Sequence, residues 1–324
     1  MKVVVVGATG HIGSYLVPRL VAAGHEVVAM SRGGRQPYVQ HPAWDEVEVV
    51  HLDRVAEDQA GTFGPRVAAG KPGAVIDLVC YDVPSAAHLA NALAPVASYL
   101  LHCGTIWVHG HGVEVPLTEQ AVRRPFGDYG VKKKAVEDLL LGEARRGALR
   151  CTVLHPGHIV GPGWPPVNPA GNFNVEVFER LACGEELDLP NFGLETVHHV
   201  HADDVAQAFV EALEQPEMAS GEAFHVVSER ALTLRGYAEA VAGWFGQPAR
   251  LSFRPYESWK DGWDKEDATA TWEHIARSPS ISIQKAKQVL GYQPRYTSLE
   301  AVFESLSWLV AEGQVNSGGR QPSF

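Results

Sequence analysis

The sequence predicts an α/β fold built on a doubly wound parallel sheet. The first observation behind this prediction is the β-branched, apolar run at residues 2–6, which is typical of a buried strand. The second is the glycine-rich turn that follows it, Gly-Ala-Thr-Gly-His-Ile-Gly at residues 7–13, with an amphipathic segment at 14–23 behind it. The third is the regular alternation of strand and helix patterns beyond that point, which is typical of parallel sheets.

The turn has the glycine spacing of a dinucleotide-binding loop. Gly7 permits a sharp exit from the strand, Gly10 removes a Cβ that would hold a pyrophosphate away from the backbone, and Gly13 lets the helix pack close to the sheet. The helix N-terminus would then face the anion. An ordinary glycine loop is the alternative, but the strand before and the helix after favour a nucleotide site, whose predicted residues are Gly7, Thr9, Gly10, His11, Ile12 and Gly13.

The residues after the second predicted strand, 26–30, bear on the choice of coenzyme. In dinucleotide folds an acid at this point binds the 2′-hydroxyl of NAD, and none is present here. Ser31 and Arg32 suit a 2′-phosphate better, so NADP is favoured over NAD, unless Arg32 is only a loop residue. Asp53, after the third predicted strand at 47–52, could accept a hydrogen bond from the adenine amino group or simply cap a helix.

The alternation continues to about residue 146. We expect strands at 74–80 and 99–103, and helices at 55–69, 85–97 and 128–146. In the last of these helices Tyr129 and Lys133 are four residues apart and share one face. A lysine ammonium and a cationic nicotinamide near a phenol lower a pKa that is otherwise about 10. Tyr129 could then exchange a proton with a substrate hydroxyl. Thr105, just after a strand, could hydrogen-bond the same oxygen.

Three motifs in order, the glycine turn, Thr105, and Tyr129 with Lys133, make the chain resemble an extended short-chain dehydrogenase/reductase of the NAD-dependent epimerase/dehydratase family. Further matches follow. The segment 154–163, Leu-His-Pro-Gly-His-Ile-Val-Gly-Pro-Gly, resembles the one that borders the nicotinamide. Residues 200–206 resemble the family's His-Val-x-Asp-x-Ala stretch, and residues 285–294 resemble its C-terminal signature.

The resemblance implies a Rossmann domain that holds the coenzyme and a smaller α+β substrate lobe. We expect the Rossmann domain to comprise residues 1–158 with 196–228, the lobe to comprise 159–195 with 229–313, and 314–324 to form a flexible tail. By position, Tyr129 would be the acid/base, Lys133 would orient the nicotinamide ribose, and Thr105 would assist. Other residues expected near the coenzyme are Val79, Cys80, Lys133, Pro156 and His158.

The substrate of the family is often a nucleotide sugar, but the sequence departs from the pattern. The stretch 195–201, Glu-Thr-Val-His-His-Val-His, has no arginine for a substrate diphosphate. A sugar-like small molecule is therefore expected, although Arg277 could still bind an anion. The candidate substrate contacts are Trp107, His109, His158, Asn172, His199 and Arg277. The aromatic stretch 256–274 could be a lid, a subunit contact, or packing of the small lobe.

Composition excludes several classes of function. The formal net charge of −11 disfavours nucleic acid as the main partner. The four cysteines are widely spaced with no Cys-x-x-Cys pair, which predicts reduced thiols in a cytoplasmic protein. The fifteen histidines show no metal-motif spacing, so no metal site is predicted. No stretch reaches the ~18 apolar residues that span a bilayer, so no membrane partner is expected.

Two functions remain. The first is an NAD(P)-dependent epimerase, dehydratase or reductase acting on a secondary alcohol or carbonyl, with Tyr129 moving the proton. The second is a non-catalytic dinucleotide-sensing or RNA-associated binding protein of the same fold, which would have no need of Thr105, Tyr129 and Lys133 together. Because the family often pairs through the helix that carries the tyrosine, a homodimer is expected.

Overall fold

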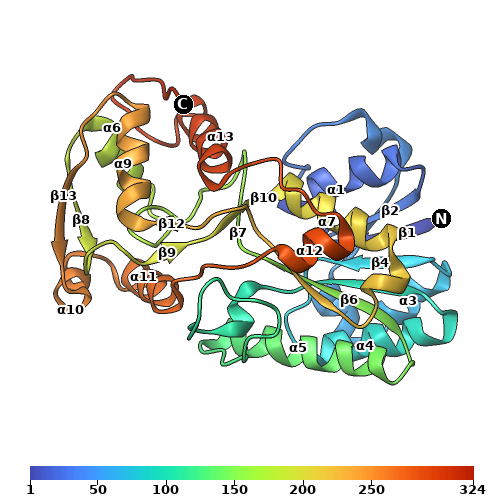
Figure 1. The fold of residues 1–324 in the computed structure, drawn as a ribbon. Helices are drawn as coiled ribbons and strands as arrows, with labels where there is room; N and C mark the ends of the chain where they lie inside the picture. Colours follow the sequence, from blue (N-terminus) through green and yellow to red (C-terminus); the bar gives the residue numbers. More distant parts are fainter.

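The computed structural model describes all residues, 1–324, and its centre is a seven-stranded parallel sheet (Figure 1). The strand order is β11-β6-β5-β4-β1-β2-β3. The order reverses beside β1, which pairs with both β2 and β4. Such a switch point opens a crevice at the carboxyl ends of the strands. The strands are β1 Lys2–Val6, β2 Glu26–Ser31, β3 Glu48–His51, β4 Ala74–Asp77, β5 Tyr99–Cys103, β6 Arg150–Pro156 and β11 Ala223–Val226.

Helices cover both faces of this sheet (Figure 1), so its strands are buried except for the edge strand β3. One apolar cluster joins the sheet to α1 His11–Ala22, α7 Ala202–Glu214 and α12 Gln284–Leu290. A second joins the opposite face to α3 Phe63–Ala69, α4 Val83–Leu93 and α5 Asp128–Arg145. The remaining elements of this half are α2 Arg54–Gln59, α8 Pro216–Ala219 and the 3₁₀ turns η1 Pro42–Glu46, η2 Ala94–Val96 and η3 Ile106–His109.

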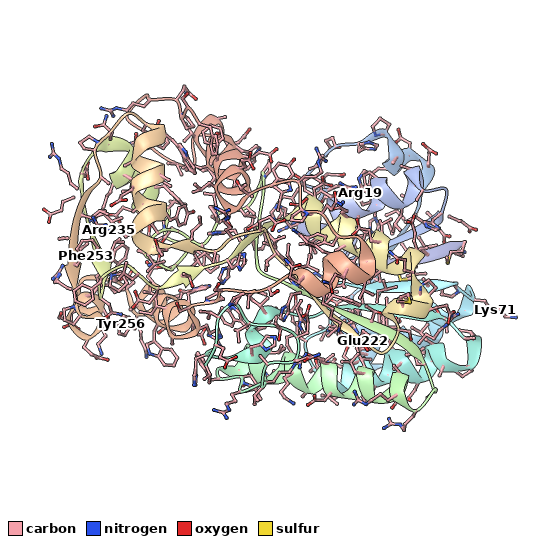
Figure 2. All side chains as sticks on the ribbon, in the orientation of Figure 1. Arg19, Lys71, Glu222, Arg235, Phe253 and Tyr256 are labelled. Carbon is pink, nitrogen blue, oxygen red and sulfur yellow. The ribbon has the colours of Figure 1, made fainter.

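A third apolar cluster forms the core of a second lobe, on the left of Figure 1. Here β8 Glu186–Pro190 pairs in parallel with β13 Arg250–Arg254, and Arg235 lies over the ring of Phe253 at 5.6 Å (Figure 2). Its helices are α6 Glu176–Cys183, α9 Leu234–Trp244, α10 Tyr256–Trp259, α11 Lys265–Arg277 and α13 Ser298–Ala311, with the turn η4 Lys260–Gly262. Two short ladders complete it: β7 His158–Val160 with β10 His199–His201, and β9 Thr196–Val197 with β12 Leu232–Thr233.

The structure differs from the sequence-based expectations in three places. The helix expected over 55–69 is two helices, because the chain turns at Gly61 with φ +69°. The segment 281–292, expected in the second lobe, packs against the sheet beside α7. The C-terminal residues, expected to be flexible, lie on the second lobe, where Val315 is buried and the ring of Phe324 contacts Trp244 and Phe303. No helix combines the length and apolar character needed to cross a bilayer.

Candidate functional site

The glycine turn is shaped as the sequence predicts, and each glycine is required by a close contact. Gly7 has φ +87°, and a Cβ there would lie 2.7 Å from Val79 Cγ1. A Cβ on Gly13 would lie 2.2 Å from the carbonyl oxygen of Ala8, so only glycine permits this packing of α1. No side chain caps the start of α1 at Gly10, so its first amides are free for an anion.

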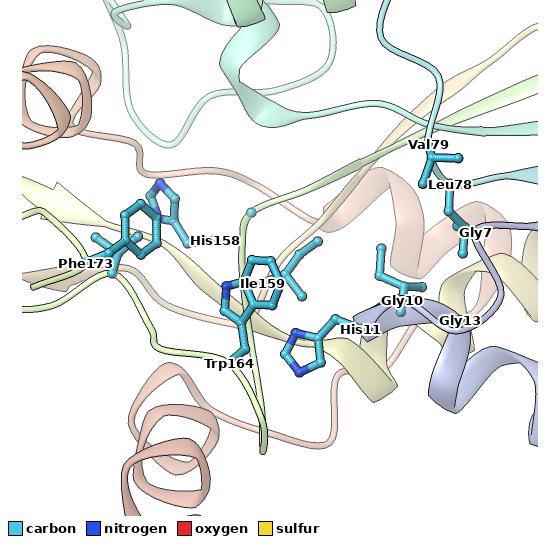
Figure 3. Close-up of a pocket in the computed structure, with 13 residues that line it drawn as sticks. Gly7, Gly10, His11, Gly13, Leu78, Val79, His158, Ile159, Trp164 and Phe173 are labelled. Atoms are coloured by element: carbon cyan, nitrogen blue, oxygen red, sulfur yellow. The ribbon is translucent and has the colours of Figure 1, made fainter. Parts of the chain in front are cut away.

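A cavity of about 270 Å³ lies over this turn (Figure 3). It extends from the glycines past the end of β4 to β7 and the loop that precedes α6. The ring of His11 stacks on that of Trp164 with centroids 5.5 Å apart and closes one side. Of the residues predicted to contact the coenzyme, the cavity contains Gly7, Gly10, His11, Ile12, Gly13, Val79 and His158. Gly157 and Ile159 belong to the segment 154–163, which resembles the one that borders the nicotinamide, whereas Leu78 and Val167 were not singled out from the sequence.

The two histidines that line the cavity are neutral. Burial lowers the pKa of His11 to about 3 and that of His158 well below its usual value, with a further contribution from His201 and His274, respectively. The backbone N–H of His198 donates to Nδ1 of His158 at 3.2 Å. The proton of His158 is therefore on Nε2, which is buried without a partner and can donate to a ligand.

Thr105, Tyr129 and Lys133 converge at the ends of β4 and β5. Thr105 caps η3 by accepting a hydrogen bond from the backbone N–H of Trp107. Its side chain also acts on the phenol of Tyr129, whose pKa it lowers. Tyr129, in the first turn of α5, packs edge-on against the ring of Trp107 at 5.7 Å. Tyr81, which the sequence did not single out, lies on its other side, 6.4 Å from ring to ring.

Lys133 is fully enclosed by protein, with 2 % of its surface exposed. Its ammonium donates to the carbonyl oxygens of Cys80 at 2.8 Å and Cys103 at 2.6 Å. Burial lowers its pKa, since no carboxylate lies within ion-pair distance. An ammonium has three donors and the carbonyls take two, so one remains for a hydroxyl.

The protonation of Tyr129 differs from the expectation. The sequence predicts a lowered pKa, but desolvation by the surrounding protein raises the pKa of Tyr129, although the residue is 41 % exposed, and Cys103 and Tyr81 add to the effect. Thr105 acts in the opposite direction and more weakly. The predicted lowering depended on a cationic nicotinamide as well as on the lysine. In the chain by itself the phenol keeps its proton, so it is prepared to act as an acid.

A second, polar cavity of about 600 Å³ lies beyond the end of β2. Thr9, Arg35 and His51 are among its lining residues. Arg32 is exposed beside it, and the hydroxyl of Ser31 accepts from the N–H of Gly33 at 3.4 Å. The lining thus contains one guanidinium, that of Arg35, and one carboxylate, that of Asp45.

Three further residues expected near the coenzyme, Asp53, Cys80 and Pro156, lie outside both cavities. The carboxylate of Asp53 caps α2, accepting from the N–H groups of Val55 at 2.9 Å and Ala56 at 3.2 Å. Cys80 is buried and offers its carbonyl to Lys133. Pro156 is the last residue of β6, directly before the cavity-lining Gly157.

Five of the six predicted substrate contacts line neither cavity. Three of them are buried in hydrogen-bonded networks instead. The amide of Asn172 donates to Thr271 Oγ1 at 3.1 Å. A ring nitrogen of His199 bonds to the carbonyl of Val167 at 3.0 Å. His109 is 1 % exposed and faces His225.

Arg277 and Trp107 lie together at the junction of the lobes. The guanidinium of Arg277 is sandwiched between Trp107 and Phe126, 3.7 Å and 3.9 Å from their ring centroids. It donates to the carbonyls of Glu273 and Phe126, both at 2.6 Å. Burial lowers its pKa to about 10. The bond to Phe126 connects α11 to the loop before Tyr129, while Nε of Arg277 is buried without a partner.

The aromatic stretch 256–274 is mostly packing. Trp259 is fully buried, donates from its indole nitrogen to the carbonyl of Asp188 at 2.8 Å, and stacks on Trp263. Trp272 is 45 % exposed and lies edge-on against Phe126. Trp272 is thus the tryptophan of this stretch that lies closest to the junction of the lobes.

The model of the NAD dependent epimerase/dehydratase family matches residues 3–226 of the chain. A similar curated protein is 2'-dehydrokanamycin reductase of Streptomyces kanamyceticus, 28% identical over 326 residues, which cover 97% of this chain and 86% of that protein. Another is the chloroplast stem-loop binding protein of 41 kDa b of Arabidopsis thaliana, 26% identical over 313 residues, which cover 94% and 78%, respectively.

Among solved structures, UDP-glucose 4-epimerase of Thermotoga maritima, determined with UDP-glucose, superposes with a TM-score of 0.73 at 20% identity. The superposition covers 96% of this chain and 99% of that one, and it supports the fold. The family match spans the glycine turn, Thr105, Tyr129 and Lys133. The chain belongs to the NAD-dependent epimerase/dehydratase family, the extended short-chain dehydrogenases/reductases.

Proposed function

We propose that this protein is an NAD(P)-dependent oxidoreductase-type enzyme that interconverts a secondary alcohol and a carbonyl on a sugar-like small molecule, as a reductase, epimerase or dehydratase. The observation that supports this most strongly is the convergence of Thr105, Tyr129 and Lys133 at the end of the crevice that begins at the glycine turn. A protein that only binds a dinucleotide has no use for a phenol held there by a threonine.

The residues present fit a dinucleotide. A Cβ at Gly7 or Gly13 would strike protein atoms, so this turn requires glycine, and both glycines line the cavity. The uncapped start of α1 offers amides to a pyrophosphate, and the orphaned Nε2–H of His158 points to a ligand acceptor beyond the turn. Bound in this crevice, a nicotinamide coenzyme supplies or accepts the hydride.

Tyr129 moves the proton. In the reducing direction its phenol donates the hydroxyl proton to the carbonyl oxygen of the substrate as the hydride reaches the carbon, and the resulting phenolate takes a proton back from solvent. Thr105 hydrogen-bonds the same oxygen and holds it within reach. The free donor of Lys133 binds a ribose hydroxyl, and the lysine charge stabilises the transient phenolate.

A substrate without a diphosphate suits this chain better. The stretch 195–201 carries no arginine that could bind one. Arg277 is engaged by two carbonyls, and His198 bonds to the carbonyl of Ser228 at 2.9 Å. A neutral or cationic polyhydroxylated molecule therefore suits the site better than a nucleotide sugar, and the similar reductase named for 2'-dehydrokanamycin agrees with this choice.

The deciding variant is Tyr129→Phe. Removing the hydroxyl removes the proton donor, so turnover should fall about 10²–10⁴-fold while the affinity for coenzyme is retained. Coenzyme binding is measured by fluorescence titration with NADH and NADPH, and nucleotide released on denaturation is quantified by mass spectrometry. Turnover is assayed on a panel of keto-sugars and UDP-sugars. Undiminished turnover in the variant would refute the assignment of Tyr129.

Stoichiometric nucleotide released from the purified protein would favour an epimerase or dehydratase, because the hydride then returns to one substrate. Reversible binding of added coenzyme would favour a reductase or dehydrogenase. Absence of dinucleotide by either route would refute the proposal as a whole.

A second candidate, an RNA-associated protein of the same fold, is favoured by the similarity to the chloroplast stem-loop binding protein. The net charge of −11 opposes it, because affinity for a phosphate backbone depends on clustered cations. Binding of a structured RNA that persists at physiological salt, together with no turnover on any carbonyl, would favour this candidate.

A further inference from the structure

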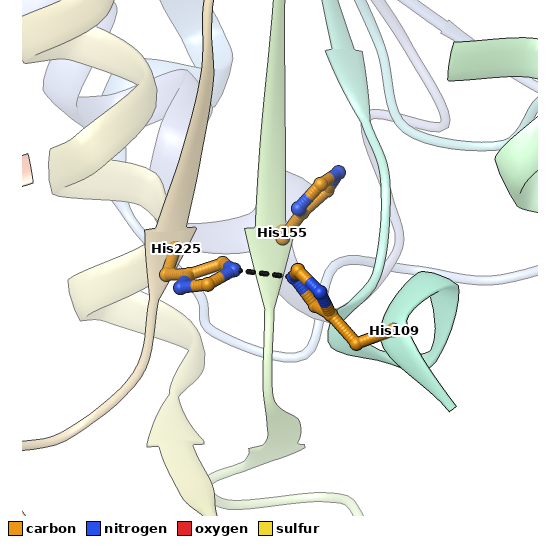
Figure 4. A group of neighbouring side chains, drawn as sticks. All are labelled: His109, His155 and His225. Atoms are coloured by element: carbon orange, nitrogen blue, oxygen red, sulfur yellow. Dashed lines mark hydrogen bonds between the residues drawn. The ribbon is translucent and has the colours of Figure 1, made fainter. Parts of the chain in front are cut away.

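Three imidazoles lie together beside strands β6 and β11 (Figure 4). His109 ends η3, His155 lies on β6 and His225 lies on the neighbouring strand β11. All three are at most 1 % exposed. One donor atom of each lies within 4.8 Å of the other two. Residue spacing does not predict this cluster, because its members come from three elements far apart in the chain.

Hydrogen bonds on two of the rings fix which nitrogen carries the proton. Nδ1 of His225 lies 3.0 Å from the carbonyl oxygen of Ser282, which can only accept, so Nδ1 is protonated and Nε2 has a free lone pair. Nε2 of His155 lies 3.0 Å from a carboxylate oxygen of Glu137, so by the same argument Nδ1 of His155 has the lone pair. That Nδ1 is buried and has no partner.

The ring of His109 completes the cluster. Its Nε2 lies 2.7 Å from Nε2 of His225, to which it donates when no cation is present. Its Nδ1 is then a second buried nitrogen without a partner. Unpaired buried polar atoms cost free energy, so two of them in one cluster call for an explanation.

We propose that His109, His155 and His225 bind a divalent transition-metal cation, with Zn²⁺ the first choice. Imidazole nitrogens are ligands that Zn²⁺ prefers, and metal-bound histidines usually donate their other N–H to a carboxylate or a backbone carbonyl, as His155 and His225 do here. On binding, the proton of His109 moves from Nε2 to its unpaired Nδ1, which leaves Nε2 as the ligand.

The rings need a small adjustment. Zn–N bonds of 2.0–2.1 Å in tetrahedral geometry separate ligand nitrogens by about 3.4 Å. The 2.7 Å contact between Nε2 of His109 and Nε2 of His225 must therefore lengthen. The ligand nitrogen of His155, which lies within 4.8 Å of the other two, must move closer to them. Both are rotations of side chains, and they require no change in the strands.

The site is structural. None of the three histidines lines the cavity over the glycine turn, so a substrate has no access to the cation. A bound metal would join η3 to the last two strands of the sheet. Thr105 caps η3, and Glu137, which bonds to His155, lies two turns beyond Tyr129 on α5. The cation would therefore hold the elements that carry Thr105 and Tyr129 in place.

The test uses the full chain without a histidine tag, stripped of metal with EDTA and titrated with Zn²⁺ against a chromophoric chelator. One tightly bound equivalent per chain is expected, with a higher thermal midpoint when Zn²⁺ is added. Co²⁺ in place of Zn²⁺ should give visible d–d bands typical of a tetrahedral site. Absence of a tight equivalent in the wild-type chain would refute the proposal.

Variants separate this site from the other histidines. His155→Gln and His225→Gln should each weaken Zn²⁺ binding at least tenfold and abolish the Co²⁺ bands. The matched control is His102→Gln, because His102 is equally buried on the adjacent strand β5 but is not a member of the cluster, and it should bind as the wild type does. Equal binding by all three variants would assign the metal to surface histidines and refute the proposal.

If the histidine variants do not fold, Glu137→Gln supplies the test. It leaves all three ligands but replaces the carboxylate behind His155, so Zn²⁺ affinity should fall about 10–100-fold. Unchanged affinity in a folded Glu137→Gln protein would contradict the ligand arrangement. Every readout is independent of turnover, so failure of the proposed enzymatic function would leave this test intact.

Discussion

The two ends of the crevice are built in opposite ways. At the nicotinamide end, Lys133 is 2 % exposed and the polar groups are fixed by backbone carbonyls and a short helix. At the adenosine end, Arg32 and Arg35 are exposed, and the cavity beside them is larger and polar. In the function proposed above, the buried end carries the chemistry. The exposed end would select the coenzyme through side chains that few neighbours constrain.

The largest expected effect is acid unfolding that originates at the buried end. In the folded chain, burial lowers the pKa values of four histidines at or beneath the cavity to about 3 to about 4, against 6.5 in an unfolded chain. These are His11, His198, His199 and His274. The unfolded state therefore binds more protons as the pH falls below about 6.5, and the stability that these neutral rings contribute is lost on the way to about pH 4.

Each such group changes the free energy of unfolding by about 1.4 kcal/mol per pH unit in this window. Four groups together should remove several kcal/mol from a total that is typically 5–15 kcal/mol. Glu211, whose pKa burial raises to about 7, opposes this with one proton. Urea unfolding followed at several pH values between about 8 and 4 measures the slope. A flat profile would contradict the view that these histidines are buried and neutral.

The next prediction concerns the variant Gly13→Ala in the glycine turn. Gly13→Ala places a Cβ 2.2 Å from the carbonyl of Ala8, so the backbone must shift. We expect a loss of about 1–3 kcal/mol in stability and a loss of coenzyme affinity. Chemical unfolding and titration with NADPH measure the two.

Gly243→Ala is the matched control. Gly243 lies inside α9 with no atom within 4 Å of a built Cβ, so alanine there should be neutral or stabilise by about 0.5–1 kcal/mol. If Gly13→Ala were as stable as this control and bound coenzyme equally well, the turn would not have the role assigned to it.

At the exposed end, Arg32→Ala should weaken NADPH binding about tenfold and leave NADH binding nearly unchanged. The reason is that a charge-assisted hydrogen bond to a phosphate contributes roughly 1.5–3 kcal/mol, less where solvent screens it. Isothermal titration with both coenzymes measures the ratio. Equal weakening of NADH and NADPH, or of neither, would remove Arg32 from coenzyme selection.

The smallest effect decides between the two interpretations of Asp53. Asp53→Ala removes the cap of α2, and we expect about 1 kcal/mol of destabilisation with little change in coenzyme affinity. Asp53→Asn, which keeps a capping oxygen, should restore stability. A selective loss of coenzyme affinity in both variants, with stability unchanged, would instead support contact with adenine.

These regions also differ in how far the sequence could predict them. The strands and the glycine turn were predictable because their signals are local: β-branched runs and glycines at fixed spacing. Tyr129 and Lys133 were recognisable from helical spacing and from the family resemblance. The contacts of His109 and Asn172 could not be predicted, because burial in a polar network depends on elements distant in the chain. The break of the helix at Gly61 could not be predicted either, because it depends on the positive φ of one residue, and a glycine does not by itself require that conformation.

The path of the chain between the lobes limits how the molecule can be divided. Residues 281–292 return from the second lobe to cover the sheet beside α7, and β11 supplies its edge strand from beyond residue 220. A fragment that ends near residue 158 would lack that edge strand and would expose the apolar face that α7 and α12 cover. We therefore expect such a fragment not to be stable by itself, and the two lobes to unfold in one cooperative transition.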